Sequence, residues 1–235
     1  GRRRKREPEA EPDVETPVED AAAEPADTSA TAVRADGEPD WAALDEREWR
    51  EQGPYDIDEV QLDDGVQRLD LGALVLTPIQ GSQLRLQIDE STQRVMSALV
   101  MVGDSALELM VFAAPRSGGQ WPETRENVIA EAKRQGGQVG LAEGPFGTEV
   151  RRIMPAKTPD GKDAVQPSRM FAAEGPRWML RGMLVGAAAM VSGEEGPAGA
   201  LLDMFRDVVV RRGDEPMAPG EVIGMKLPDS MTPQG

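Results

Sequence analysis

The first forty residues differ in composition from the rest of the chain, and they limit how much of it can fold. Five basic residues lie between Arg2 and Arg6, and residues 7–40 then hold twelve acidic residues and one arginine, a net charge of 1 − 12 = −11. No aromatic residue occurs before Trp41. Such a segment cannot bury enough apolar surface to offset the entropy lost on ordering. We therefore expect a disordered tail here, and a folded part that begins near Trp41.

Composition predicts four segments along the chain. Residues 1–40 form the charged tail, basic and then acidic, and residues 41–52 form a short amphipathic helix. Residues 53–228 form a single α+β domain, and residues 229–235 form an irregular C-terminus. Without the tail, 235 − 40 = 195 residues remain, which is enough for one domain with a substantial core.

The folded part contains neither histidine nor cysteine. This excludes disulfides, thiolate-metal sites, thiol catalysis and the Ser-His-Asp triad, and it removes the most common general base. The paired carboxylates, such as Asp63 with Asp64, stand in turn-like sequence without the spacing of a calcium loop. We identify no catalytic residue, no metal ligand set and no cofactor motif.

Periodicity predicts the secondary structure of the domain. Residues 83–89 alternate polar and apolar side chains with a period of two, as in a half-buried strand. Residues 94–102 and 106–114 predict two strands joined by a Gly-Asp turn. Helices are expected over residues 122–135, which begin with Pro122 and end before a glycine pair, and over residues 197–206.

Further strands complete the predicted α+β fold. They are expected within residues 66–76, 138–143, 148–154, 168–173, 177–185 and 208–210. We therefore predict a mainly antiparallel sheet of about seven to nine strands, with two helices packed on it.

A glycine-rich connection precedes the first of these helices and is one candidate site. It contains Arg116, Ser117, Gly118 and Gly119, and Trp121 and Arg125 follow in the helix. Backbone N–H groups at a helix N-terminus can hold an anion. The alternative is a tight strand-to-helix connection in which Trp121 packs in the core. Neither the P-loop pattern nor the dinucleotide fingerprint is met.

A second candidate site lies at residues 175–182, which read Gly-Pro-Arg-Trp-Met-Leu-Arg-Gly. Alternation in a strand places Arg177 and Arg181 on one face, with Trp178 and Leu180 on the other. The functional interpretation is a small basic groove. The structural alternative is a strand with two solvated or ion-paired arginines.

Four stretches of the sequence carry a family resemblance: the two candidate segments above, Gly-Pro-Phe-Gly at 144–147 and Val-Val-Val-Arg-Arg-Gly-Asp at 208–214. They resemble the actinobacterial family catalogued as domain of unknown function 3710. The resemblance covers roughly residues 53–228. It implies a cytoplasmic bacterial protein, and it brings no established activity and no catalytic residues.

Three functions remain open. We favour a non-enzymatic interaction or adaptor protein, because no catalytic constellation is found and the tail is highly charged. The first alternative is a small-ligand or anion-binding domain that uses loop 115–125 with Arg177 and Arg181. The second is a carboxylate- or metal-dependent enzyme.

Charge and hydropathy set expectations about partners. The net charge of −16 argues against strong nucleic-acid binding and favours an unidentified protein partner. The longest apolar stretch has nine residues, 183–191, too short to cross a bilayer. The basic cluster between Arg2 and Arg6 is expected to give at most weak, salt-sensitive contact with a membrane surface, because the acidic run beside it competes for the same charges.

Overall fold

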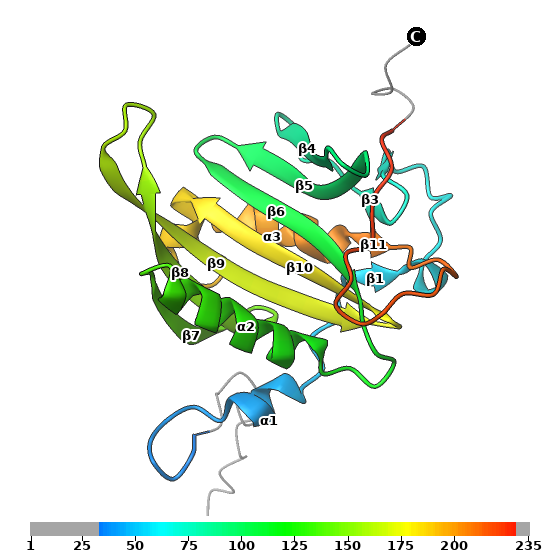
Figure 1. Ribbon diagram of the computed structural model, residues 1–235. Coiled ribbons are helices and arrows are strands. Elements are labelled where there is room, and N and C mark those ends of the chain that lie inside the picture. Colours follow the sequence, from blue (N-terminus) through cyan, green and yellow to red (C-terminus); the bar gives the residue numbers. More distant parts are fainter. Residues whose placement is uncertain (1–32, 229–235) are drawn as a thin grey trace, which may run out of the picture. The chain divides into compact units, whose positions relative to one another are not determined.

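The seven-stranded antiparallel sheet organises the protein (Figure 1). The computed structural model describes residues 33–228. The predicted disorder of the tail up to residue 32 and the predicted irregular C-terminus, residues 229–235, therefore lie outside the described residues. The strand order in the sheet is β4-β5-β6-β10-β9-β8-β7, and every neighbouring pair is antiparallel. The strands are β4 Gln83–Asp89, β5 Arg94–Val102, β6 Ser105–Ala113, β7 Gln138–Gly144, β8 Gly147–Lys157, β9 Asp163–Gly175 and β10 Trp178–Gly186.

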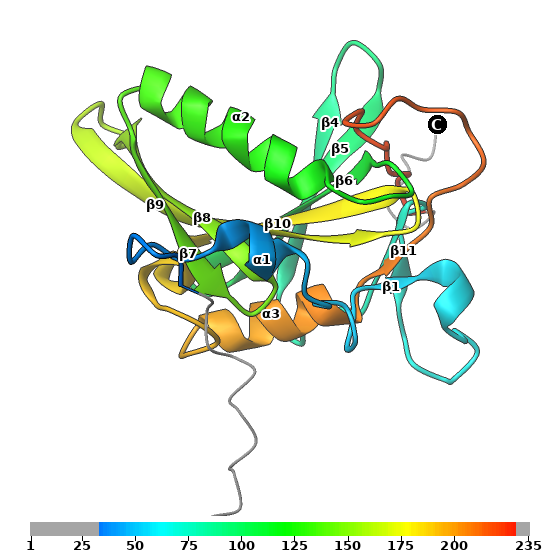
Figure 2. The same ribbon diagram turned by 90° about the horizontal axis from the view of Figure 1, so that it is seen from below.

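Helices cover both faces of this sheet. Helix α2, Gln120–Arg134, lies on one face, and helix α3, Ala198–Asp207, lies on the other (Figure 2). Strand β10 serves both layers, because Trp178, Leu180 and Leu184 belong to the cluster on the α3 side whereas Met179 belongs to the cluster under α2. A strand buried on both faces explains why apolar residues are nearly continuous there.

A smaller sheet extends the α3 side of the core. It has the order β1-β11-β3-β2, in which β1 is parallel to β11 and the other pairs are antiparallel. Its strands are β1 Tyr55–Asp56, β2 Leu69–Asp70, β3 Leu74–Leu76 and β11 Val209–Val210, and the 3-10 helices are η1 Ile57–Glu59 and η2 Ala187–Met190.

Three aromatic rings fill the space between α3 and the large sheet. Phe205 of α3 packs edge-on against Phe146 at 4.6 Å and against Phe171 at 4.9 Å between ring centroids. A Cβ at Gly182 would lie 2.5 Å from the Phe171 ring. Glycine at this position therefore lets the aromatic cluster approach β10 closely.

The C-terminal part of the described chain closes a gap in the large sheet. Strands β5 and β6 pair only over residues 98–102 and 105–109. Beyond that pairing, the Ile223 N–H donates to the Val111 carbonyl and the Met225 N–H donates to the Val95 carbonyl, both at 2.8 Å. Residues 223–225 thus bond to both strands where these have separated, and Ile223 and Met225 are buried.

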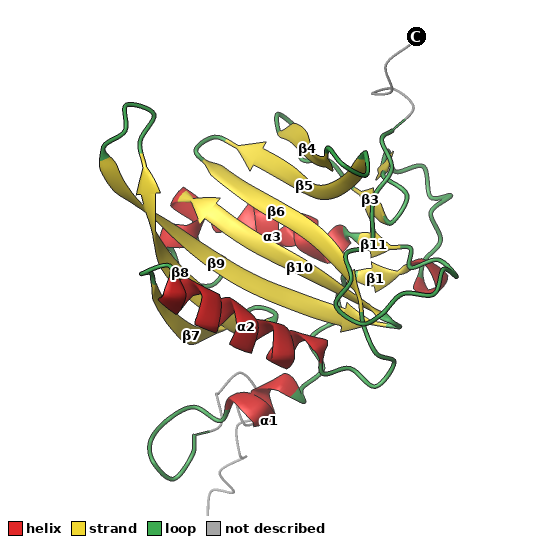
Figure 3. Cartoon of the chain, viewed as in Figure 1, coloured by secondary structure: helices red, strands yellow, loops and turns green. Residues whose placement is uncertain are grey.

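The fold is α+β with mostly antiparallel strands, as the sequence predicts, and it differs from the prediction in three details. The strands form two sheets, because β1, β2, β3 and β11 pair among themselves. Strands β8 and β9 are longer than expected and continue past their neighbours as a two-stranded ribbon (Figure 3). Of the segment 41–52, only Trp41–Asp45 is helical, as α1, with Asp40 accepting a hydrogen bond from the Ala43 N–H as its N-cap. No helix among residues 33–228 is long and apolar enough to cross a membrane.

Candidate functional site

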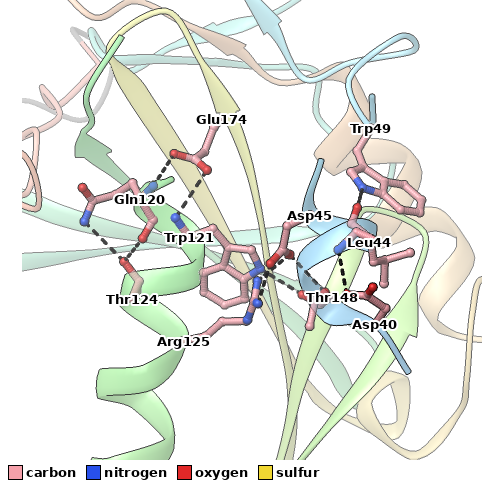
Figure 4. A network of polar contacts seen from close by, with 11 residues as sticks. Asp40, Leu44, Asp45, Trp49, Gln120, Trp121, Thr124, Arg125, Thr148 and Glu174 are labelled. Carbon is pink, nitrogen blue, oxygen red and sulfur yellow. Dashed lines mark hydrogen bonds and ion pairs between the residues drawn. The ribbon is translucent and has the colours of Figure 1, made fainter. Parts of the chain in front are cut away.

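The N-terminus of α2, which the sequence suggests as an anion site, is capped by a carboxylate from the protein itself. Gly119 is the N-cap and supplies no side chain. The Glu174 carboxylate instead accepts hydrogen bonds from the Gln120 N–H at 2.8 Å and the Trp121 N–H at 3.4 Å (Figure 4). A carboxylate at this end also complements the helix dipole. Glu174 therefore takes the position that an external anion would need.

Trp121 and Arg125 have structural contacts. The Trp121 ring is buried, and its Nε1–H donates to the Thr148 carbonyl at 2.9 Å. The Arg125 guanidinium makes a bidentate ion pair with Asp45 of α1, with both N···O distances 2.7 Å, and Thr148 Oγ1 donates to the same carboxylate (Figure 4). These two candidate residues hold α1 against α2 and β8.

The rest of the N-terminal segment is bound in the same way. The Arg50 guanidinium makes a bidentate pair with Glu59 and also donates to the carbonyl oxygens of Pro54 and Glu174. Trp49 packs against Gly147, where a Cβ would lie 2.9 Å from the Trp49 Nε1 and φ is +97°. The charged groups of Arg50 and Arg125 are therefore paired with carboxylates of the protein itself.

Arg116 and Arg177 line a different feature, a groove of about 1080 Å³. Three segments form most of it: residues 116–118 before α2, residues 175–177 in the β9–β10 turn, and residues 211–214 after β11. Ser117 and Gly118 therefore face this groove, and they also line a cavity of about 530 Å³ with Gly119 and residues 45–50. We call the larger feature the arginine groove.

Three guanidinium groups in the arginine groove have no ion pair with a carboxylate among the described residues: Arg116, Arg177 and Arg212. Arg177 Nη2 donates to the Gly213 carbonyl at 2.8 Å, and Arg212 Nε donates to the Arg177 carbonyl at 3.1 Å. Arg116 is exposed. These backbone contacts orient two of the three cations without neutralising them.

Arg181 lies elsewhere, so the four predicted arginines do not converge. Arg177 precedes β10 in the turn, with φ at +61°, and the simple alternation that placed it on the same face as Arg181 does not apply there. Arg181 lies on the α2 side of the sheet, where its Nη2 is 3.4 Å from the Glu108 carboxylate. The structure brings Arg116 and Arg177 to one groove, pairs Arg125 internally, and places Arg181 in a third location.

Comparisons with known proteins place the chain in a family. A family model described as "Protein of unknown function (DUF3710)" matches residues 53–234. The chain belongs to the DUF3710 family. Most of the arginine groove lies within the matched residues, whereas α1 and Arg50 precede them. No match is found among curated proteins.

One solved structure shows limited similarity to this DUF3710 protein. It is a crystal structure from Bacteroides thetaiotaomicron, 11% identical, with a TM-score of 0.35. The match covers 61% of this chain and 47% of that chain, so it spans about half of the solved protein.

Sequence reasoning about this DUF3710 protein did not identify three important residues. Arg212 follows β11 and lines the arginine groove. Glu149 and Arg169 form a fully buried bidentate pair, at 2.8 and 3.0 Å, and both side chains are 0% exposed. No local signal identifies that pair, because its members lie on separate strands, twenty residues apart.

Proposed function

We propose that this DUF3710 protein is a non-enzymatic interaction protein whose arginine groove binds an acidic segment of a partner protein. The observation that carries the proposal is the clustering of Arg116, Arg177 and Arg212 in one groove without carboxylate partners among the described residues. Other arginines of the same lining are paired, Arg50 with Glu59 and Arg211 with Asp70. Guanidinium groups offer forked donors that match carboxylates.

The acidic residues of the arginine groove reduce its attraction for an acidic segment. Asp56 accepts hydrogen bonds from the Trp178 Nε1–H and from the Asp58 N–H, and Glu174 caps α2, so both serve the fold. Asp58 and Asp214 are exposed in the same lining. We therefore expect an affinity that is moderate and sensitive to salt.

The shape of the groove favours a chain segment over a small molecule. Its lining comes from separated parts of the fold, and it extends from the loop before α2 across the β9–β10 turn to the residues after β11. The alternative in which loop 115–125 binds a small ligand or anion with Arg177 and Arg181 is less favoured. Glu174 already accepts the hydrogen bonds of the Gln120 and Trp121 N–H groups that such an anion would use. The carboxylate- or metal-dependent enzyme stays an untested prediction.

Charge reversal at Arg116 tests the proposal with little risk to the fold, because no described residue contacts the Arg116 guanidinium through a hydrogen bond or ion pair. We expect Arg116→Glu to weaken binding of a fluorescently labelled ten-glutamate peptide at least about tenfold in anisotropy titrations at low salt. Arg85→Glu is the matched control, since Arg85 is an exposed arginine of β4 that has no ion pair with another residue between 33 and 228. Equal losses in both variants, or none in Arg116→Glu, would refute binding in this groove.

A further inference from the structure

A second basic feature lies on the other side of α2 from the N-terminal segment. A hollow of about 530 Å³ opens between the flank of α2 and the face of the large sheet. The sheet contributes Arg152, Arg181, Met170 and Met183, and α2 contributes mainly polar residues that include Thr124 and Asn127. We call it the α2 hollow.

Three arginines line the α2 hollow, and two of them, Arg152 and Arg181, have weak partners. Arg152 Nε lies 3.4 Å from Ser168 Oγ, and its Nη2 lies 3.3 Å from the Met183 thioether. Arg181 makes its side-chain hydrogen bonds through Nη2 alone, at 3.4 Å from Glu108 and 2.9 Å from the Met110 thioether, and its guanidinium lies over the Phe112 ring at 5.2 Å from the ring centroid. A guanidinium carries five N–H donors, so most donors of this pair have no acceptor among residues 33–228.

The charges around the pair leave it positive. Glu108 is the carboxylate that faces both cations, and at the rim Arg134 is paired with Glu131. Burial lowers the pKa of Arg181 and of Arg152 below the ordinary value, and for Arg181 the charge of Arg152 adds to this effect, although Glu108 opposes it. Two cations that share one carboxylate in a half-closed site would be stabilised by an additional anion.

We propose that the α2 hollow binds an oxyanion, a phosphate or carboxylate group carried on an apolar body, between the guanidinium groups of Arg152 and Arg181. Both oxyanions accept the forked donors of arginine. The thioethers of Met170 and Met183, together with Val128, supply apolar surface for the rest of the ligand. This site is separate from the arginine groove, and no residue lines both.

Calorimetric titration of the full chain with phenyl phosphate, benzoate and inorganic phosphate tests the proposal. We expect phenyl phosphate or benzoate to bind more tightly than inorganic phosphate, and the tighter of the two aromatic probes identifies the oxyanion. Arg152→Gln should weaken that probe at least about tenfold, because a hydrogen bond to a charged group is lost. Arg85→Gln removes an exposed arginine elsewhere and should leave the affinity unchanged.

Glu108→Gln is expected to change the affinity in the opposite direction, and it tests the proposal even if Arg152→Gln does not fold. Removal of the Glu108 carboxylate, which faces both arginines, should tighten binding about threefold or more. Binding of no probe, wild-type affinity in folded Arg152→Gln, or unchanged or weaker binding in Glu108→Gln would overturn the proposal. Arg116→Glu should leave these titrations unchanged, and a loss in that variant would place the probe in the arginine groove instead.

Discussion

Two regions of this protein use arginine in opposite ways. Where α1 meets α2, the Arg125 side chain is 8% exposed and its guanidinium makes a bidentate pair with Asp45. In the arginine groove, Arg116, Arg177 and Arg212 have no carboxylate partner in the described part of the chain. The difference teaches that an arginine near a glycine-rich loop indicates a binding site only once its acceptor within the fold is known. Side chains whose charge is balanced within the fold stabilise it, and the others are available to a partner.

The largest expected effect comes from the most completely internal pair, Glu149 with Arg169. Glu149→Ala leaves a fully buried guanidinium without its carboxylate, which should lower the free energy of unfolding by about 3–5 kcal/mol. Urea denaturation measures this loss. The double variant Glu149→Leu with Arg169→Met removes both charges and should recover most of the stability, and an equally unstable double variant would show that the pair contributes more than balanced charge.

A smaller effect is expected where α1 docks. Asp45→Ala removes the partner of Arg125 and an acceptor of the Thr148 hydroxyl, which should lower the free energy of unfolding by about 1–3 kcal/mol. Hydrogen exchange should also become faster in residues 41–50, because this pair holds the segment. Asp36→Ala, in an exposed pair with Arg34, is the control and should change stability by less than about 0.5 kcal/mol. Unchanged exchange in Asp45→Ala would argue against a docking role.

The smallest effect is a dependence on pH at Glu59. The hydrogen bond from Arg50 holds the pKa of the Glu59 carboxyl below its ordinary value of 4.5, and burial partly opposes this. A lowered folded-state pKa means that this stabilisation is complete above the unfolded-state value and is lost as pH falls through the folded-state value. The pair is partly exposed, so we expect less than about 1 kcal/mol.

Unfolding free energies at pH 6 and pH 3 measure this contribution. Glu59→Gln should lose less stability than the wild type between these two values. A wild type and a variant with the same acid sensitivity would show that Glu59 does not contribute.

Much of the fold follows from local sequence patterns. Strands β4 and β5 coincide with the predicted residues 83–89 and 94–102, because alternation and a Gly-Asp turn are visible locally. Strands are also predicted within residues 66–76 and 208–210, where β2, β3 and β11 lie, but their pairing in a separate smaller sheet is not predicted. These strands have two or three residues, and Tyr55 pairs with Val209 far along the chain, so local periodicity carries no signal for the pairing.

The candidate site was predicted only in part, for a similar reason. The sequence identifies Arg116 and Arg177, and the structure brings them to one groove with Arg212. The sequence alone cannot show that Glu174, at the end of β9, caps α2, or that Asp45 pairs with Arg125 eighty residues later. Each of these acceptors is supplied by tertiary structure, and each decides whether a nearby donor is available to a ligand.

The most direct test of the contrast between the two regions compares Arg116→Gln with Arg125→Gln. Affinity for the labelled ten-glutamate peptide is measured by anisotropy at a temperature where both variants are folded. We expect Arg116→Gln to bind roughly tenfold more weakly than the wild type, and Arg125→Gln to stay within about twofold of it. Wild-type affinity in Arg116→Gln, or a loss confined to Arg125→Gln, would contradict the assignment of the arginine groove as the binding surface.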